Sequence, residues 1–416
     1  MGGAHSHSHG DGPDLRVSSR ARFVLLGVLA LCGLGTVAGL WALWPDTQAL
    51  AKATSAAQYA APGVTFPEAQ VRKVQPGCTS AEPAPTEGGF DEGGARGSAL
   101  PCGEVTARVL EGVDRGRTVS FQVPPEVSTA GVARGDTLKL VRTPRAAEVP
   151  PTFSLFGVDR SSTIWWLTLI FVVAVLLVAR LRGLLALLGL GIGGAVLMWF
   201  MLPALLLGES GLGVALVGSS AIMFPVLYLA HGPSMRTSAA LAGTLLGIFV
   251  TAFVGVVAVK SARLSGITDE GGAILSTFVG DVSFQGLLTC ALIVAGLGVL
   301  NDVTITQASA VWELRGADPS MNRRHLFASA MRIGRDHIAS TIYTIVFAYA
   351  GTALSVLLLL FLYQRPVADL LYTEDISTEV ITTLATAIGL VLAVPATTAI
   401  AALTVGSSRL RRAGLS

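Results

Sequence analysis

Long apolar stretches recur along this chain and are separated by short polar connections. From residue 161 to 405 most apolar runs hold roughly twenty residues, the length that a helix needs to cross the hydrocarbon core of a bilayer. An earlier run, 22–44, has a similar length and ends at Trp41 and Trp44, as at a membrane interface. We therefore predict about eight spans, at 22–44 and near 162–179, 184–207, 211–230, 238–259, 283–305, 338–362 and 379–404.

The predicted fold class is mostly α: a polytopic helical membrane protein with a small all-β module between its first two spans. The seven later spans form a membrane domain of residues 161–405. For residues 22–44 a cleavable signal peptide is the alternative, because basic residues precede the apolar run. The length of the run favours a retained span.

Residues 45–160 form the one extended polar region between apolar runs. Residues 45–102 are rich in Pro, Gly, Ala and Glu and predict a linker, although 68–74 has strand character. Residues 103–160 predict the β module, with period-two runs at 104–110, 118–123 and 137–141. A barrel related to the oligonucleotide-binding type fits this pattern. Its few aromatics and mixed charges indicate a structural or docking role without a nucleic-acid partner.

Composition and charge agree with a membrane protein and indicate its orientation. The chain is 52% hydrophobic and 13% charged, and its mean hydropathy is +0.64. Arginines gather at both ends of the chain and at alternate connections, whereas the other short connections hold only Lys260, Arg263 and Arg365. By the positive-inside rule, the tails 1–21 and 406–416 are cytoplasmic and the β module lies outside the cytoplasm. The first tail is predicted to be disordered and the second is basic.

The four cysteines are too few for a disulfide framework. Cys78 and Cys102 are both in the polar region, so they are candidates for a disulfide if that region is extracytoplasmic. The alternating His5, His7 and His9 have no further ligands nearby, and we predict a tail there rather than a metal site.

The candidate chemistry lies where polar residues interrupt the sixth span. Asn301 and Asp302 follow a Gly-containing apolar run, and a charge at membrane depth is costly without a partner. If the helix continues to Glu313, then Asp302, Thr306, Ser309 and Glu313 share one face at spacings of four, three and four. This face could line a path for a cation or proton. Alternatively, the helix leaves the membrane at Asp302 and the face is solvated.

Candidate partners for Asp302 precede the seventh span. If the two spans fold back as a helical hairpin, Arg335 could pair with Asp302 or Glu313. His337 belongs to the side-chain type that changes its charge near neutral pH. The alternative is that Arg335 is a positive-inside anchor and Asp336 caps the helix.

Enzyme and nucleotide-binding motifs are absent from the sequence. It has no phosphate-binding loop, no His-Glu-x-x-His and no Gly-x-Ser-x-Gly elbow. We therefore expect neither catalysis nor a cofactor or metal. The expected partners are the lipid bilayer, a small solute or ion, and an envelope protein.

The same segments resemble the YibE/F family of bacterial multi-pass membrane proteins. The resemblance is carried by residues 296–304, 307–314 and 333–341 and by the Ala-Tyr-Ala-Gly sequence at 348–351, and it covers about 103–403. It implies a polytopic protein of the bacterial cytoplasmic membrane with an extracytoplasmic β domain. It implies no catalytic residues.

Two functions follow as expectations. The first is a permease-type transporter of a small solute or ion, with Asp302 in its pathway. The alternative is a membrane scaffold or regulatory protein whose β module docks an envelope partner.

Overall fold

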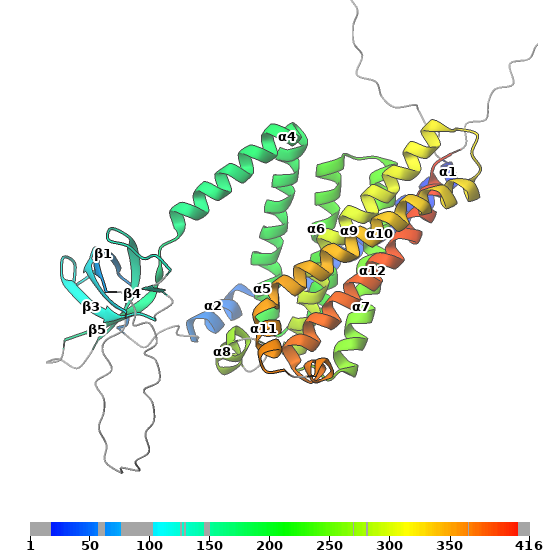
Figure 1. Cartoon of the computed structure of the whole chain (residues 1–416). Helices are drawn as coiled ribbons and strands as arrows, with labels where there is room; N and C mark the ends of the chain where they lie inside the picture. Colours follow the sequence, from blue (N-terminus) through cyan, green and yellow to red (C-terminus); the bar gives the residue numbers. More distant parts are fainter. Residues whose placement is uncertain are drawn as a thin grey trace, which may run out of the picture. The chain divides into compact units, whose positions relative to one another are not determined.

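The computed structural model describes residues 18–56, 63–75, 103–124, 127–128, 130–144, 150–268, 270–279, 282–364 and 366–406. Two compact units are formed, one of residues 58–174 and one of residues 1–57 and 175–416. The first contains a β-sheet module and the second a bundle of long helices (Figure 1). Cys78 and Cys102 lie outside the described residues, so their disulfide stays a prediction.

The β module is a five-stranded antiparallel sheet. Its strands follow the order β3-β2-β1-β4-β5, with bounds β1 Glu68–Val74, β2 Glu104–Val109, β3 Thr118–Gln122, β4 Thr137–Thr143 and β5 Thr152–Val158. Alternate residues of the three central strands are fully buried, among them Val71, Val105 and Leu140. The period-two pattern thus predicted which side chains form the core of this module.

The predicted boundary at residue 103 is wrong for the sheet. The stretch predicted as linker contains α2 (Thr47–Ala56) and β1, and β1 is the central strand. Ala69 of β1 lies opposite Val109 on one side and Leu138 on the other. A strand with so few apolar residues gives a weak signal, and its central place depends on pairing with strands far along the chain.

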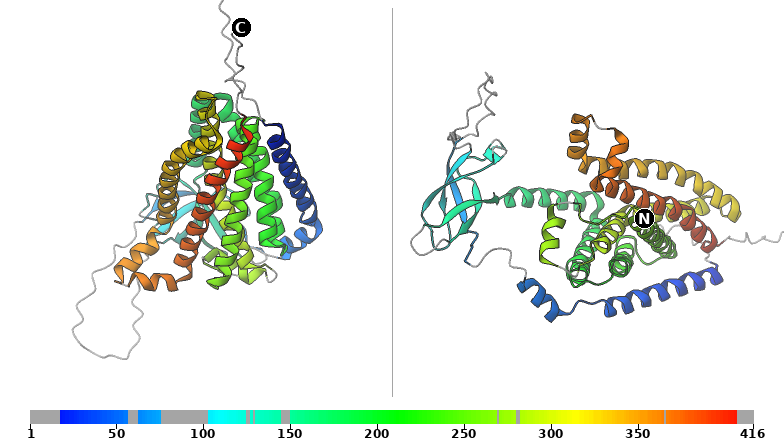
Figure 2. Two further views of the ribbon diagram at one scale, coloured as in Figure 1. Left: turned by 90° about the vertical axis from the view of Figure 1, so that its right-hand side faces the viewer. Right: turned by 90° about the horizontal axis from the view of Figure 1, so that it is seen from below.

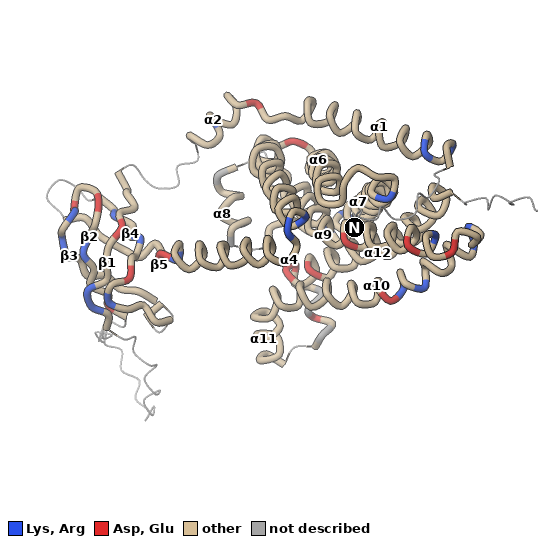
Figure 3. Tube along the Cα trace, turned by 90° about the horizontal axis from the view of Figure 1, so that it is seen from above, with Lys and Arg blue, Asp and Glu red and all other residues tan. Residues whose placement is uncertain are grey.

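An ion pair ties the β2–β3 turn to β4. Arg142 donates from Nε to Asp114 Oδ2 at 2.5 Å, and Arg117 Nη1 lies 3.3 Å from Asp114 Oδ1. The hydrogen bond from Arg142 is the main reason that the pKa of Asp114 lies below its ordinary value. Figure 3 shows charged residues of both signs along the strands. The Asp114–Arg142 ion pair is therefore a local contact of this turn and does not belong to a surface with a single sign of charge.

The Asp114–Arg142 pair predicts a pH dependence of the module's stability. The pKa of Asp114 is lowered in the folded state. The ionised carboxylate therefore stabilises the folded module at pH values above the unfolded-state pKa of ~3.9, and this stabilisation is lost as the pH falls through the folded-state pKa. We expect the protection of β2 and β4 amides against hydrogen exchange, relative to their intrinsic exchange rates, to fall at acid pH in the parent protein. In Asp114→Asn this protection should already be lower at neutral pH and change less with acidification. Glu104→Gln, on a partly exposed carboxylate of β2 that has no ion pair among the described residues, is the control, and identical profiles for all three proteins would contradict the prediction.

The second unit consists of helices that are long and apolar enough to span a membrane. Six such segments occur in the described part of the chain, or seven if one bent pair counts as a span. They are α1 Ser19–Ala42, the continuous run α4-η1-α5 over Ser161–Leu206, α6 Gly211–His231, α7 Met235–Ser261, α9 Phe284–Ala317, α12 Glu374–Thr404, and the pair α10 Arg323–Thr352 with α11 Leu354–Leu362. The shorter helices are α8 Glu270–Phe278 and η2 Val367–Tyr372. The polytopic α-helical class is therefore confirmed.

The helical run from Ser161 holds 46 residues, a rise of ~69 Å and more than twice the hydrocarbon thickness of a bilayer. Its backbone leaves the helix at Arg180, where φ is 51° and ψ is −130°. This break lies between the predicted spans 162–179 and 184–207. The run is therefore long enough to provide both predicted spans.

The region of the predicted span 338–362 is formed by two helices, α10 and α11, rather than by one. Helix α10 begins much earlier, at Arg323, and it meets α11 at a bend of 66°. The bend follows Gly351 and Thr352, residues of low helix propensity that give no signal in an apolar profile.

Helices α7, α9 and α12 pack through small residues at the centre of the bundle (Figure 2). A Cβ atom at Gly247 of α7 would lie 2.8 Å from Leu300 Cδ2 of α9 and 3.1 Å from Ala393 Cβ of α12. Gly243, one turn earlier, faces Thr397 of α12. The close approach at this glycine pair fixes which faces of α9 and α12 point inward.

Candidate functional site

The hairpin of α9 and α10 holds the candidate site. Helix α9 continues past Glu313 to Ala317, so the condition for the predicted polar face is met. Arg315, which is 1% exposed, donates from Nη1 to the carbonyl oxygens of Pro319 and Met321 in the connection. Asn322 then caps α10 by accepting a hydrogen bond from His325 N at 2.8 Å. These contacts fix how the two helices meet.

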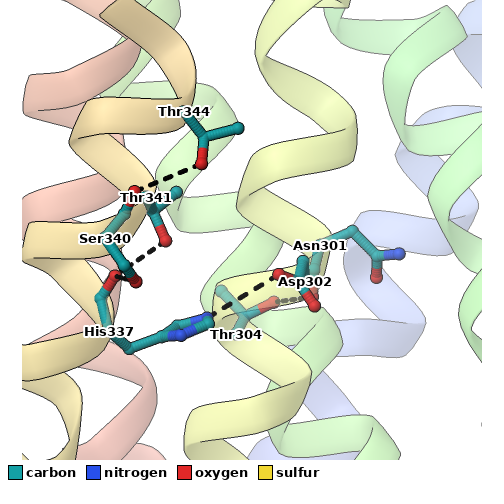
Figure 4. Close-up of polar contacts among 7 residues, drawn as sticks. All are labelled: Asn301, Asp302, Thr304, His337, Ser340, Thr341 and Thr344. Atoms are coloured by element: carbon teal, nitrogen blue, oxygen red, sulfur yellow. Dashed lines mark hydrogen bonds and ion pairs between the residues drawn. The ribbon is translucent and has the colours of Figure 1, made fainter. Parts of the chain in front are cut away.

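Asp302 of α9 faces His337 of α10 (Figure 4). His337 Nε2 lies 3.7 Å from Asp302 Oδ2, beyond hydrogen-bond distance but within range of an ion pair when the imidazole is protonated. The side chain of Asp302 is 68% exposed and that of His337 is 29% exposed. His337 Nε2 itself is buried and has no hydrogen-bond partner. The carboxylate therefore lies at the edge of the bundle, and the imidazole reaches it from inside.

The other predicted residues do not join this pair. Thr306 and Glu313 are exposed and Ser309 is partly buried, so the predicted stripe follows the outer side of α9. Arg335 and Asp336 are also exposed, and no ion pair to Arg335 occurs among the described residues. The partner of Asp302 is therefore His337 rather than Arg335.

Asn301, the neighbour of Asp302, points to a different side. Its side chain turns away from Asp302 and His337 (Figure 4), and its Oδ1 atom is buried without a hydrogen-bond partner. Successive residues on a helix are separated by 100°. The Asn-Asp sequence thus places an amide and a carboxylate on different faces of α9.

A buried polar network on the inner face of α9 was missed by sequence reasoning. Gln307 Nε2 donates to Ala330 O of α10 at 2.9 Å and to Thr398 Oγ1 of α12 at 2.8 Å. Thr304 and Thr244 of α7 share a hydrogen bond of 2.6 Å. The sequence held one signal for this network. Thr304 and Gln307 are three residues apart and therefore share a face of α9, just as the residues of the predicted stripe share another face.

Gly334 makes room for this network. A Cβ atom there would lie 2.8 Å from Gln307 Oε1 and 2.9 Å from Val394 Cγ1. Gly334 is one turn before His337 on α10, so the close approach that admits Gln307 also brings the imidazole toward α9. The inner network therefore positions the candidate site.

A cavity of about 660 Å³ lies elsewhere in the helical unit. It is lined by apolar residues of α1, α6, α7 and α12, including Leu25, Leu216 and Phe249, and includes neither Asp302 nor His337. No group of three or more His, Cys, Asp or Glu residues suited to a metal occurs in the part of the chain that was searched, the described residues.

Comparison with known proteins identified one family. A family model described as YibE/F-like protein matches residues 167–407, which includes the α9–α10 hairpin and α12 but not the β module. Comparisons with curated proteins and with solved structures found no significant match.

The buried network predicts a stability difference between the two faces of α9. Gln307→Ala removes two interhelical hydrogen bonds and leaves a cavity, so we expect the free energy of unfolding to fall by about 2 kcal/mol. Thr306→Ala, on the exposed face of the same turn, should change it by less than about 0.5 kcal/mol. Thermal unfolding in detergent compares the two variants with the parent, and equal midpoints for all three proteins would contradict the prediction.

Proposed function

Because the chain belongs to the YibE/F-like family and carries apolar helices of spanning length, we propose that this membrane protein is a permease-type transporter of a small solute or ion rather than an enzyme. The main observation that supports this proposal is the Asp302–His337 pair, which lies within helices long enough to span a membrane. Ionisable side chains within membrane-spanning segments are rare and generally mark an ion or proton pathway.

The depth of the pair supports this role. Asp302 is eighteen residues beyond Phe284, the first residue of α9, a rise of ~27 Å along a helix. This is close to the ~30 Å thickness of the hydrocarbon core. The charge bias of the connections favours the cytoplasmic side for this end, with both termini cytoplasmic in a bacterial cytoplasmic membrane. Asp302 and His337 then form the inner mouth of the pathway.

The chemistry of the pair favours coupling to protons or cations. A protonated His337 attracts the Asp302 carboxylate across 3.7 Å, whereas a neutral imidazole leaves the carboxylate free for a cation. The two charge states thus differ in their affinity for a transported ion. Such a difference can couple two fluxes.

The proposal predicts that Asp302→Asn abolishes flux. The purified protein is placed in liposomes that contain a pH-sensitive dye, and a potassium diffusion potential drives proton movement. We expect flux in the parent, none in Asp302→Asn, and strongly reduced flux in His337→Gln. Asp375→Asn, at an exposed carboxylate of α12, should match the parent. Equal flux in parent and Asp302→Asn would refute the role of Asp302.

A second proposal concerns the β module. We propose as the alternative function that it docks an envelope protein while the spans anchor it. Support comes from its own buried core and from Val113, which is 87% exposed in the β2–β3 turn.

The docking proposal predicts loss of a partner. Deletion of residues 46–158, or Val113→Asp in the full chain, should abolish recovery of a specific envelope protein after crosslinking in intact cells. Val113→Ile, which keeps an apolar tip, should retain it. If the deletion leaves proton flux intact and no crosslinked protein depends on the module, the docking function is excluded.

A further inference from the structure

A second ionisable group, Glu379, lies where α9, α10 and α12 pack together. It is at the end of these helices that is far from the α9–α10 connection. Glu379 is in the second turn of α12, which begins at Glu374. Its Oε2 atom is buried and has no hydrogen-bond partner. An unpaired buried carboxylate oxygen is costly, so this atom needs a proton or another ligand.

The surroundings of Glu379 differ from those of the acidic residue that begins the helix. Glu374 Oε1 accepts hydrogen bonds from Gly266 N and from the hydroxyl of Ser265, each at 2.8 Å. Such donors stabilise an ionised carboxylate. Glu379 has no such donors at Oε2. Two carboxylates of one helix, five residues apart, thus have opposite environments.

Tyr349 of α10 lies close to the side chain of Thr386 on α12 and within electrostatic range of Glu379. Glu379 and Thr386 are seven residues apart and share one face of α12. The hydroxyls of Thr378 and Thr386 are also buried without hydrogen-bond partners of normal geometry. The unpartnered oxygens of Glu379 and Thr386 therefore lie along one face of α12.

Helix α10 leads from Tyr349 to His337. The two residues are twelve positions apart, which places them ~120° apart around the helix. Thr341 is buried between them, and its hydroxyl donates to His337 O at 2.8 Å. The distance from Tyr349 to His337 along the helix is ~18 Å, more than half of the ~30 Å hydrocarbon thickness. Tyr349 and His337 are thus well separated in depth along α10.

We propose that Glu379 is a proton-binding site at the end of the pathway opposite to Asp302 and His337, with Tyr349 as its positioning residue. Protonation places a hydrogen on the carboxyl group, removes its charge and gives it a donor for the neighbouring hydroxyls. Release returns the proton toward water at the start of α12 or inward toward Thr386. This assignment rests on the proposed transport function and adds the group that exchanges protons at its other end.

Few other charged or titratable groups lie on the described elements packed against this end of α12. They are Tyr349 on α10, Cys290 on α9, Lys260 on α7, and Asp369 and Tyr372 in η2, together with Glu374 and Asp375 of α12 itself. None of the ion pairs formed by the described residues includes Glu379. The proton is therefore the ligand that the structure leaves to this carboxylate.

The test uses dicyclohexylcarbodiimide, an apolar reagent that attacks protonated carboxyl groups. The purified full-length protein is labelled at several pH values, and adducts are located by mass spectrometry. We expect modification of Glu379 that slows roughly tenfold per pH unit above its titration midpoint. Glu374 is the internal control and should stay unmodified. No adduct at Glu379, or equal adducts at Glu379 and Glu374, would overturn the proposal. So would protection of Glu379 by sodium at constant pH, which would assign the site to a metal cation.

Transport gives the second readout. Glu379→Gln should lower proton flux in liposomes by at least about tenfold, and Tyr349→Phe should lower it less. Glu374→Gln, the matched carboxylate variant, should keep most of the flux. If the parent protein shows no flux, the transporter proposal fails, while labelling of Glu379 still decides whether the carboxyl group binds a proton. Parent flux with an unaffected Glu379→Gln overturns the present inference alone.

Discussion

The close packing of α7, α9 and α12 is the constraint on which the candidate site depends. Gly243 and Gly247 let α7 approach the other two helices, and Gly389 of α12 makes a similar approach to Thr251. Within lipid, helices gain little from the hydrophobic effect when they associate. Close van der Waals packing and interhelical hydrogen bonds therefore stabilise their association. This packing sets the rotation of α9 and hence which of its polar residues face protein.

The rotation of α9 divides its polar residues into two functional classes. Thr304 and Gln307 are satisfied by neighbouring helices and hold the bundle together. Asp302 is directed to the edge of the bundle, where His337 is its one ion-pair partner among the described residues. A group that is fully satisfied in one state has little reason to change, whereas a weakly paired carboxylate can respond to a proton or an ion. The structure therefore separates the stabilising polar groups from the responsive ones.

The α10 helix links both ends of the proposed pathway because it packs on α9 and on α12. His337 lies on the part of α10 that meets Asp302, and Tyr349 lies on the part that approaches Thr386, on the face of α12 that carries Glu379. Beyond Tyr349 the chain bends by 66° into α11. A rigid-body tilt of α10 would alter both contacts at once, which is the mechanical requirement for access from one side at a time.

The sequence by itself determined the class of this protein, the extent of most spans, the alternation in the β strands and the α9–α10 hairpin. Run length and period two are local properties, and they predicted these features well. Only the tertiary structure decided that β1 is central, that His337 rather than Arg335 faces Asp302, and that Glu379 has a buried oxygen. The physical reason is that lipid and protein interior are both apolar. Periodicity therefore shows that Asp302 and Thr306, or Thr304 and Gln307, share a face of α9, but only packing decides which face is inside.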